Sequence, residues 1–200
     1  MSQSMKYKIN EIFFSMQGEG FNQGKEVVFI RLSGCNLKCS WCDTNHHTFE
    51  EKSISEIIAI INSHSCKSVI ITGGEPFTHN LLTLLIELKK NSIWIAIESN
   101  GTIKPSEEIL AHIDYIAISP KGETALTAVN EVRLVNTSLS ADFLSSIESK
   151  IKADNYFISP LDSNGKMNIE ESLSLLGKIN SISSKKWRMS LQLHKFAGIR

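Results

Sequence analysis

The sequence has few cysteines, few prolines and no excess of charge of either sign. Four cysteines and four prolines occur in 200 residues, and 21 basic residues balance 21 acidic ones. This balance leaves no surplus of lysine and arginine to neutralise phosphates, which argues against extended binding of nucleic acid. No apolar run approaches the roughly 18 residues of a membrane span, and residues 1–10 lack the apolar segment of a secretion signal. We therefore expect a soluble, cytoplasmic protein with no nucleic-acid or membrane partner.

The chain also lacks low-complexity stretches, proline-rich linkers and strict repeats, so we expect one domain over residues 1–200. Instead, short β-branched runs recur along the chain, and such runs are typical of buried parallel strands. They lie at Val27–Leu32, Val69–Thr72, Ile93–Ile97, Tyr115–Ile118, Val132–Val135, Tyr156–Ile158 and Trp187–Leu193.

Apolar residues at helical spacing separate several of these runs. The clearest helix begins at Ser53, which forms a capping box with Glu56, and continues in an isoleucine stripe to Ile61. Similar stripes lie at 81–88, 143–151 and 169–176. This alternation predicts an α/β fold with a parallel sheet. Because a complete eight-fold barrel typically needs about 250 residues, we expect a partial TIM-like barrel of about six parallel strands with flanking helices. An extra N-terminal strand is expected near Ile9–Phe14, and a doubly wound open sheet is the alternative.

Polar segments, several with glycine or proline, follow the predicted strands rather than precede them. They are Ser33–Thr44, Thr72–Pro76, Glu98–Gly101, Ser119–Lys121, Ser159–Asp162 and His194–Lys195. The carboxyl ends of parallel strands share one face, and ligands bind there. The sequence thus predicts one site built from six separated segments.

Three of the four cysteines, Cys35, Cys39 and Cys42, fall within eight residues. In a chain without a secretion signal, this grouping favours reduced, metal-binding thiolates over disulfides. Thiolate sulfur is the preferred ligand of iron-sulfur clusters. Three thiolates leave the fourth iron of a cubane open, and a ligand with an amine and a carboxylate could chelate it.

A zinc site is the alternative for these cysteines, with Cys66, His46 or His47 as the fourth ligand. Zinc knuckles usually present paired Cys-x-x-Cys arms, whereas the first gap here is three residues and no second arm exists. Cys66 directly precedes the apolar run 69–71 and is interpreted as a small buried hydrophobe.

The pattern Cys35-x3-Cys39-x2-Cys42 resembles the cluster loop of radical S-adenosylmethionine (SAM) enzymes. The turn Gly73–Pro76, Gly-Gly-Glu-Pro, is similar to the motif that follows their second strand, where the glycine backbone binds the methionine end of SAM. The resemblance implies a [4Fe-4S] cluster and SAM as cofactors. Reductive cleavage of SAM would give methionine and a 5'-deoxyadenosyl radical, which abstracts a hydrogen atom from the substrate.

Further matches, over nearly the whole chain, resemble the 7-carboxy-7-deazaguanine synthase family. Arg31 corresponds to an arginine that pairs with the substrate carboxylate, a role that suits a bidentate guanidinium. Thr44 corresponds to a residue that binds Mg²⁺ through its hydroxyl. Substrate binding is thereby implied for Met16, Gln17, Gly18, Glu19, Arg31 and Thr72.

The same resemblance implies a set of SAM-binding positions. They are Trp41, Cys42, Asp43, Gly73, Gly74, Glu75, Ser99, Ser119, Pro120, Lys121, Ser159, Pro160, Leu161 and Asp162. Glu98 and Asn100 are looser matches for the ribose of SAM. Ser159 departs from the family pattern, in which many relatives have glutamine, so we expect a side-chain contact to be lost there. His46 and His47 are expected to line the loop, and Gln192–Lys195 resembles the C-terminal strand of the family, with the role of His194 left open.

Members of this family convert 6-carboxy-5,6,7,8-tetrahydropterin to 7-carboxy-7-deazaguanine with loss of ammonia, in queuosine precursor synthesis. The resemblance also implies a homodimer and an electron donor such as flavodoxin or ferredoxin. A glycyl-radical-enzyme activating protein, which acts on a polypeptide, and a zinc-binding interaction module are the alternatives. The segment Gln17–Glu19 and Arg31 favour a small carboxylated substrate.

Overall fold

A computed structural model describes residues 5–42, 44, 48–163 and 165–199 of the chain. Its internal contacts divide the chain into two compact units. Unit 1 comprises Met1–Met16, Lys25–Ser99 and Ile103–Ile116, and unit 2 comprises Gln17–Gly24, Asn100–Thr102 and Ala117–Arg200. The expectation of one domain over the chain stays a prediction.

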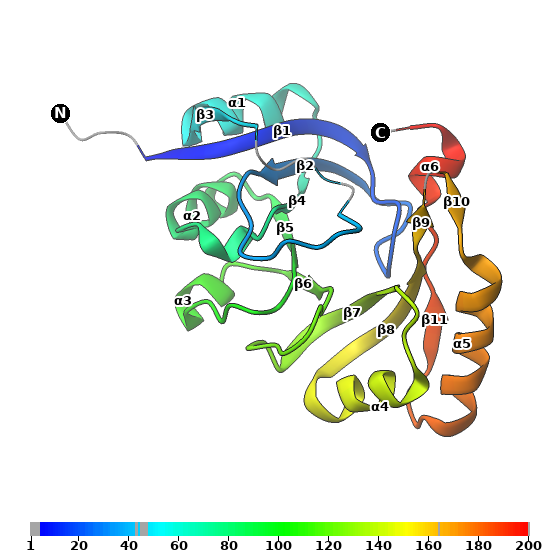
Figure 1. Cartoon of the computed structure of the whole chain (residues 1–200). Coiled ribbons are helices and arrows are strands. Elements are labelled where there is room, and N and C mark those ends of the chain that lie inside the picture. The colour runs from blue at the N-terminus through cyan, green and yellow to red at the C-terminus, as the bar shows by residue number, and fades with distance from the viewer. Residues whose placement is uncertain (1–4, 43, 45–47, 164, 200) are drawn as a thin grey trace. The chain divides into compact units, whose positions relative to one another are not determined.

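The strands among the described residues of unit 1 lie in the order β3-β1-β2-β4-β5. They are β1 (Lys6–Met16), β2 (Glu26–Leu32), β3 (Glu50–Ser53), β4 (Ser68–Gly73) and β5 (Trp94–Ser99). The strands β2, β4 and β5 run parallel, whereas β1 is antiparallel to both β2 and β3, beside which it lies in Figure 1. The parallel strands are almost continuously apolar, as expected for strands that are buried on both faces.

A β-bulge interrupts the pairing of β1 with β2. Ile9 lies opposite Leu32, but Glu11 rather than Asn10 lies opposite Arg31. A bulge inserts one extra residue in one strand and thereby re-aims the side chains that follow. After the bulge, Phe13 pairs with Phe29, and their rings stack with centroids 5.0 Å apart.

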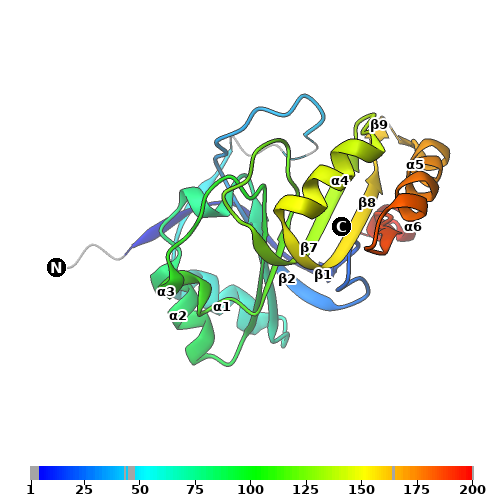
Figure 2. The same cartoon turned by 90° about the horizontal axis from the view of Figure 1, so that it is seen from below.

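The α-helices in the described part of unit 1 are α1 (Ile54–Ser63), α2 (Leu82–Lys90) and α3 (Glu107–Leu110). The predicted capping box of α1 is confirmed, since Glu56 N–H donates to Ser53 Oγ and Ser53 N–H donates to the Glu56 carboxylate. Ile57 and Ile61 of its apolar stripe are fully buried. The helix α2 packs against both α1 and α3, and the three appear together in Figure 2.

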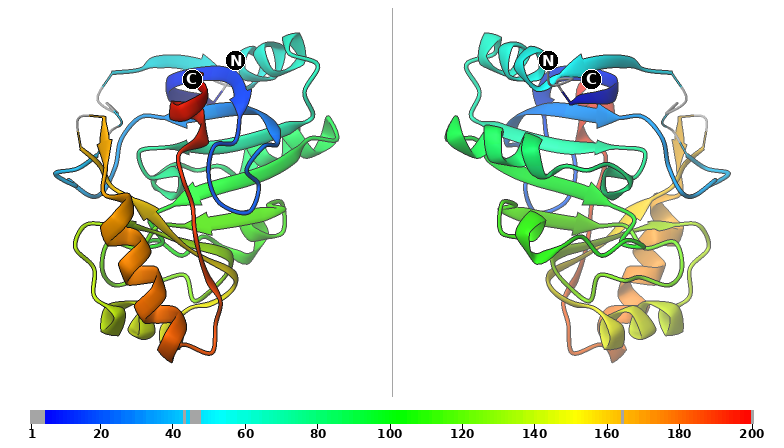
Figure 3. Two further views of the ribbon diagram at one scale, coloured as in Figure 1. Left: turned by 90° about the vertical axis from the view of Figure 1, so that its right-hand side faces the viewer. Right: turned by 90° about the vertical axis from the view of Figure 1, so that its left-hand side faces the viewer.

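Unit 2 contains parallel strands in the order β11-β8-β7-β6. They are β6 (Tyr115–Ile118), which straddles the boundary between the units, β7 (Ala128–Asn136), β8 (Lys152–Pro160) and β11 (Trp187–Met189). The helices are α4 (Ala141–Lys150), α5 (Ile169–Ile182) and α6 (Leu193–Ala197). A short hairpin of β9 (Asp162–Ser163) and β10 (Lys166–Met167) follows β8. The helix α5 packs on α4, β8 and β11, and Figure 3 shows the segment after α5 running back along it toward α6.

The predicted strand Trp187–Leu193 is wrong in its second half. The strand ends at Met189, and Leu193 begins a helix whose C-cap, Gly198, has a left-handed φ of 65°. Because Leu193 N–H donates to Gly18 O, this part of the chain pairs with a loop instead of continuing along β8. The strand-like interpretation of Gln192–Lys195 fails for the same reason. The other predicted strands and helices are confirmed, with differences of up to six residues at their ends.

No helix in the described part of the chain combines the length and the apolar character needed to cross a membrane.

Candidate functional site

The cysteine loop follows β2 directly, as the sequence predicts. Cys35 and Cys39 are half-buried, Cys42 is exposed, and all three thiols are free. The loop backbone folds on itself, with Cys42 N–H donating to Cys39 O at 3.2 Å and Leu37 N–H donating to Cys35 Sγ at 3.4 Å. One loop therefore presents three reduced sulfur atoms.

Burial raises the pKa of the Cys35 thiol. The N–H of Leu37 acts in the opposite direction, whereas the nearby Glu75 carboxylate, Cys39 and Cys42 raise this pKa further. Cys39 and Cys42 therefore both lie within electrostatic reach of Cys35. No group of three or more His, Cys, Asp or Glu residues is arranged to hold a single metal ion among the residues that the structure describes. In an iron-sulfur cluster each thiolate binds a different iron atom, whereas a zinc site gathers its ligands on one ion.

The glycine turn at the end of β4 is joined to the cysteine loop through backbone atoms. Gly74 N–H donates to Leu32 O, and Glu75 N–H donates to Gly34 O, both at 2.9 Å. A Cβ atom on Gly74 would lie 1.7 Å from Gly34 O and 3.1 Å from Cys35 N. Only glycine at this position allows such a close approach.

A buried carboxylate supports the same turn. Glu75 has no exposed surface, and its Oε1 accepts hydrogen bonds from Phe77 N–H at 3.1 Å and from Ser99 Oγ at 2.8 Å. Thr72 Oγ1, at the end of β4, donates to Glu98 Oε2 at 3.0 Å. The structure thus brings Thr72, Glu75 and Ser99 together across β4 and β5, as the prediction of clustered strand ends requires.

Arg31 lies on β2, the strand next to β4, and is held by one residue of β1 and one residue of the cysteine loop. Its Nε donates to Glu11 Oε1 at 2.7 Å, and its Nη1 donates to Thr44 Oγ1 at 3.1 Å. The ring of Phe13 lies 5.7 Å from the guanidinium carbon. Arg31 and Thr44, which the sequence predicts as separate site residues, are therefore in contact. Sequence reasoning missed Glu11, because its position opposite Arg31 depends on the bulge in β1.

In unit 2, the loop Gln17–Gly24 is held by hydrogen bonds at several points. Gly24 N–H donates to Gln17 O at 2.9 Å, which closes the loop, and Gln23 Nε2 donates to Gly18 O at 3.0 Å. Leu193 N–H also donates to Gly18 O, and Gly18 approaches the backbone and ring of His194 so closely that a Cβ atom would lie 2.1 Å from its Nδ1. The predicted substrate-binding segment and His194 therefore lie side by side.

The end of β8 carries a polar atom that lacks a partner. Ser159 is buried, and its Oγ makes no hydrogen bond with any described residue. Farther along, Asp162 Oδ2 accepts from Lys195 Nζ at 2.6 Å, and this hydrogen bond lowers the pKa of Asp162. In the segment after β6, Lys121 Nζ donates to Ser119 Oγ at 2.5 Å.

The predicted site residues thus fall into two groups. The cysteine loop, the glycine turn, Arg31 and Thr44 lie in unit 1, whereas Gln17–Gly24 and the segments at 119–121, 159–162 and 194–195 lie in unit 2. The joining of all six segments in one site stays a prediction. Asp43, His46 and His47 lie outside the described residues. Cys66 is buried, and its thiol lies within hydrogen-bond distance of Glu26 O and Ser68 O, which agrees with its interpretation as a core residue.

The residues present fit the cofactors that the motifs imply. Three free thiols on one loop suit an iron-sulfur cluster, and the buried Ser159 hydroxyl, which has no partner among the described residues, suits a polar ligand. The side of Gly34 on which a Cβ atom would lie faces open space, so its part of the loop can accept a ligand closely.

Comparisons with known proteins agree with this site. Residues 29–125 match the model of the radical SAM superfamily. The chain is 46% identical to the 7-carboxy-7-deazaguanine synthase of Haemophilus influenzae, over 96% of this chain and 94% of the relative, and 38% identical to that of Neisseria meningitidis, over 97% and 94%. The crystal structure of QueE from Escherichia coli superposes with a TM-score of 0.72 at 25% identity, over 95% of each chain.

This likeness confirms the α/β fold class of partial-barrel type. Membership of the superfamily makes the chain a radical SAM enzyme with a [4Fe-4S] cluster and SAM as cofactors. The chain belongs to the 7-carboxy-7-deazaguanine synthase family of the radical SAM superfamily.

Proposed function

We propose that this enzyme converts 6-carboxy-5,6,7,8-tetrahydropterin to 7-carboxy-7-deazaguanine with loss of ammonia, as a carbon-nitrogen lyase in queuosine precursor synthesis. The observation that carries the proposal is the backbone joint between Gly34 and Gly74–Glu75. Because this joint fixes the glycine turn against the cysteine loop, a SAM molecule on the turn would lie beside a cluster on the loop. When bound, the cluster and SAM together supply the one-electron chemistry that generates a 5'-deoxyadenosyl radical.

The chain itself binds and orients the substrate in this proposal. Arg31 would receive the substrate carboxylate, with Glu11 holding its Nε so that the Nη edge can form a bidentate pair. Thr44, which accepts a hydrogen bond from Arg31, would contribute its hydroxyl to Mg²⁺. The carboxylate would lie between two cationic groups, which it would partly neutralise. Magnesium would supply electrostatic polarisation of the substrate oxygens.

Residues of unit 2 complete the proposed assignments. Gln17, Gly18 and Glu19 would contact the substrate, and the segments at 119–121 and 159–162 would contact SAM. The buried Ser159 hydroxyl, which has no partner in the described chain, would donate to or accept from SAM, so a side-chain contact is retained there. We also propose a homodimer, an electron donor of the flavodoxin or ferredoxin type, and a cytoplasmic location, where thiols stay reduced.

Anaerobic turnover with the carboxypterin tests the proposal. Reconstituted, reduced enzyme with SAM and Mg²⁺ should form the deazaguanine and ammonia. Because this conversion is redox-neutral, 5'-deoxyadenosine should accumulate only from cleavage of SAM that is uncoupled from product formation. The variant Cys39→Ala should bind less iron and form no product. Cys66→Ala is the matched control: Cys66 is buried outside the loop, so this variant should keep the iron content of the wild type.

The same assay separates the alternatives. A reduced enzyme that cleaves SAM but leaves the carboxypterin unchanged would favour a polypeptide substrate and overturn the proposal. Metal analysis that finds one zinc ion and no iron after reconstitution would favour the zinc-binding module.

A further inference from the structure

Two charged residues face the same side of β7 at positions where a parallel strand is usually apolar. Glu131 is 1% exposed and Arg133 is 8% exposed. Residues i and i+2 of a strand point to the same face, so the two side chains lie next to each other, and Arg133 Nε donates to Glu131 Oε1 at 2.8 Å. Buried charges are costly unless they are paired and hydrogen-bonded. Such a pair inside the sheet therefore calls for a reason beyond packing.

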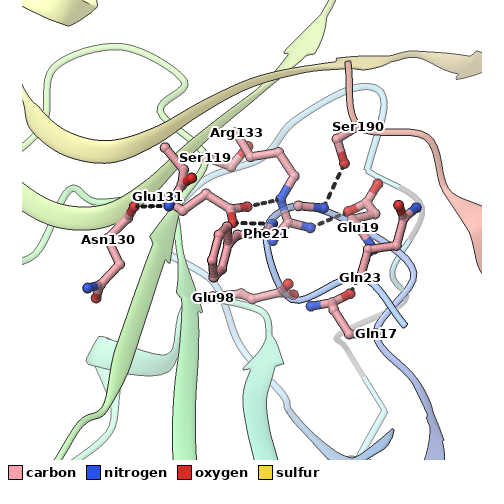
Figure 4. Close-up of polar contacts among 12 residues, drawn as sticks. Gln17, Glu19, Phe21, Gln23, Glu98, Ser119, Asn130, Glu131, Arg133 and Ser190 are labelled. Atoms are coloured by element: carbon pink, nitrogen blue, oxygen red, sulfur yellow. Dashed lines mark hydrogen bonds and ion pairs between the residues drawn. The ribbon is translucent and has the colours of Figure 1, made fainter. Parts of the chain in front are cut away.

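The pair is connected to the loop Gln17–Gly24 by both of its members. Arg133 Nη1 donates to Glu19 Oε2 at 2.6 Å, and the Glu131 carboxylate accepts from Phe21 N–H at 2.8 Å. Figure 4 shows Arg133 between Glu131 on one side and Glu19 on the other. Gly20, between the two attachment points, donates its N–H to Ser190 Oγ at 2.8 Å.

The backbone of this loop fits closely on the Glu131 carboxylate. Gly20 has a φ of 70°, and a Cβ atom there would lie 2.1 Å from Glu131 Oε1 and 2.6 Å from Oε2. Both a left-handed conformation and this close contact favour glycine. The loop conformation is therefore adapted to a carboxylate at position 131.

The guanidinium of Arg133 is suited to hold two carboxylates at once. Its Nε and Nη1 donors point in fixed directions, one to Glu131 and one to Glu19, whereas the single ammonium of lysine has no such planar fork. Gln17 Oε1 in turn accepts from Glu19 N–H at 3.1 Å. The orientation of Gln17 and Glu19 thus depends on a chain of contacts that begins on β7.

We propose that Glu131 and Arg133 are positioning residues for the substrate: they fix the loop Gln17–Gly24 so that Glu19 and its neighbours are oriented before the carboxypterin binds. This inference rests on the proposed function for the substrate, whereas the ordering of the loop itself does not.

The test uses the reconstituted holoenzyme with Arg133→Lys and Glu131→Gln, which preserve size and most polarity. Each change removes or weakens a charge-assisted hydrogen bond, so the KM for the carboxypterin should rise about 10- to 100-fold. Iron content should stay at the wild-type value. More 5'-deoxyadenosine should form per deazaguanine, because a misplaced substrate lets the radical be quenched elsewhere. Arg188→Met is the matched control, since Arg188 is an exposed arginine of unit 2 that donates to Asn155.

Hydrogen exchange of the free enzyme gives a readout that needs no substrate. The amides of Gly20 and Phe21 should exchange faster in both variants than in the wild type and in Arg188→Met. If a single variant fails to fold, the double variant Glu131→Gln/Arg133→Met replaces the buried ion pair with an uncharged one and should show the same faster exchange.

The outcomes are distinguishable. Unchanged exchange of the Gly20 and Phe21 amides overturns the inference, and so does an unchanged KM together with an unchanged ratio of the two products. A third outcome is that the variants exchange faster at these amides but the wild-type enzyme does not convert the carboxypterin. This result would support the role of Glu131 and Arg133 in ordering the loop and would reject the proposed substrate.

Discussion

The joint between the cysteine loop and the glycine turn can be tested with a single added methyl group. In Gly74→Ala, the new Cβ would begin 1.7 Å from Gly34 O, and real contacts of this kind essentially never fall below 3.0 Å. The two backbones must therefore separate by about 1.3 Å, the difference between these distances. Because the obstacle is backbone rather than a flexible side chain, no change of rotamer can relieve the overlap.

The expected loss of folding stability follows from the packing and the hydrogen bond that this separation disrupts. Overpacking of a tight site costs typically about 1–3 kcal/mol, and loss of the hydrogen bond from Glu75 N–H to Gly34 O adds about 1 kcal/mol. A total near 3 kcal/mol should lower the Tm of the apoprotein by about 6–12 °C, at about 2–4 °C per kcal/mol for a chain of this size. Because the shift moves Cys35 as well, iron content and SAM affinity should fall too.

Gly177→Ala provides the control. Gly177 lies inside α5, where a Cβ atom meets nothing within 4 Å, so alanine should raise the stability by about 0.5–1 kcal/mol. Thermal unfolding under anaerobic conditions, iron analysis and SAM titration would be measured for both variants. If Gly74→Ala keeps the wild-type Tm, iron content and SAM affinity, the joint does not hold the two motifs together.

Three further predictions concern other residues of the site. Thr44→Ala should reduce turnover more than iron content, whereas Thr44→Ser should retain activity because it keeps the hydroxyl. Unchanged turnover of the alanine variant at saturating Mg²⁺ would reject the magnesium role. Ser159→Ala should raise the Tm of the apoprotein by about 2–4 °C, because it removes a buried hydroxyl without a partner in the described chain, yet weaken SAM binding about three- to tenfold; equal SAM affinity in calorimetry would contradict the assigned contact. The hydrogen bond from Lys195 depresses the pKa of Asp162, so the pair stabilises the fold above the pKa of the unfolded state and loses this effect as the pH falls through the folded value. An NMR titration should accordingly show a higher Asp162 pKa in Lys195→Met, and an identical titration curve would refute it.

Much of the fold could be predicted because apolar patterns and strand-end motifs are local signals. The run Tyr115–Ile118 and the capping box at Ser53 and Glu56 appear in the structure as predicted. The segment after Met189 was misassigned because alternating leucine and polar residues suit either a strand or a helix end. Its helix is selected by a contact with Gly18, which lies far away in the sequence.

The contacts between charged residues of the site could not be read from the sequence in the same way. Glu131 and Arg133 alternate with apolar residues, a pattern typical of a strand with one exposed face, so the sequence does not indicate that they are buried. Nothing in the sequence places Glu19 beside them either. The role of Glu11 as a partner of Arg31 depends on one irregular position in β1. Pairing across distant segments is a tertiary property, and sequence periodicity does not contain it.

That irregular position makes the geometry of the site sensitive to a single backbone residue. Were β1 a regular ladder beyond Ile9, Asn10 would stand opposite Arg31, and Glu11 would point to the other face, opposite Ile30. The same change of register would remove the stacking of Phe13 on Phe29. Plain alternation would put Ile9, Glu11 and Phe13 on one face, whereas the extra residue lets Ile9 lie opposite Leu32 while Glu11 and Phe13 lie opposite Arg31 and Phe29 on the other face. Replacing β1 with a regular strand in a redesigned enzyme would keep the sheet but remove both the contact of Glu11 with Arg31 and the stacking of Phe13 on Phe29.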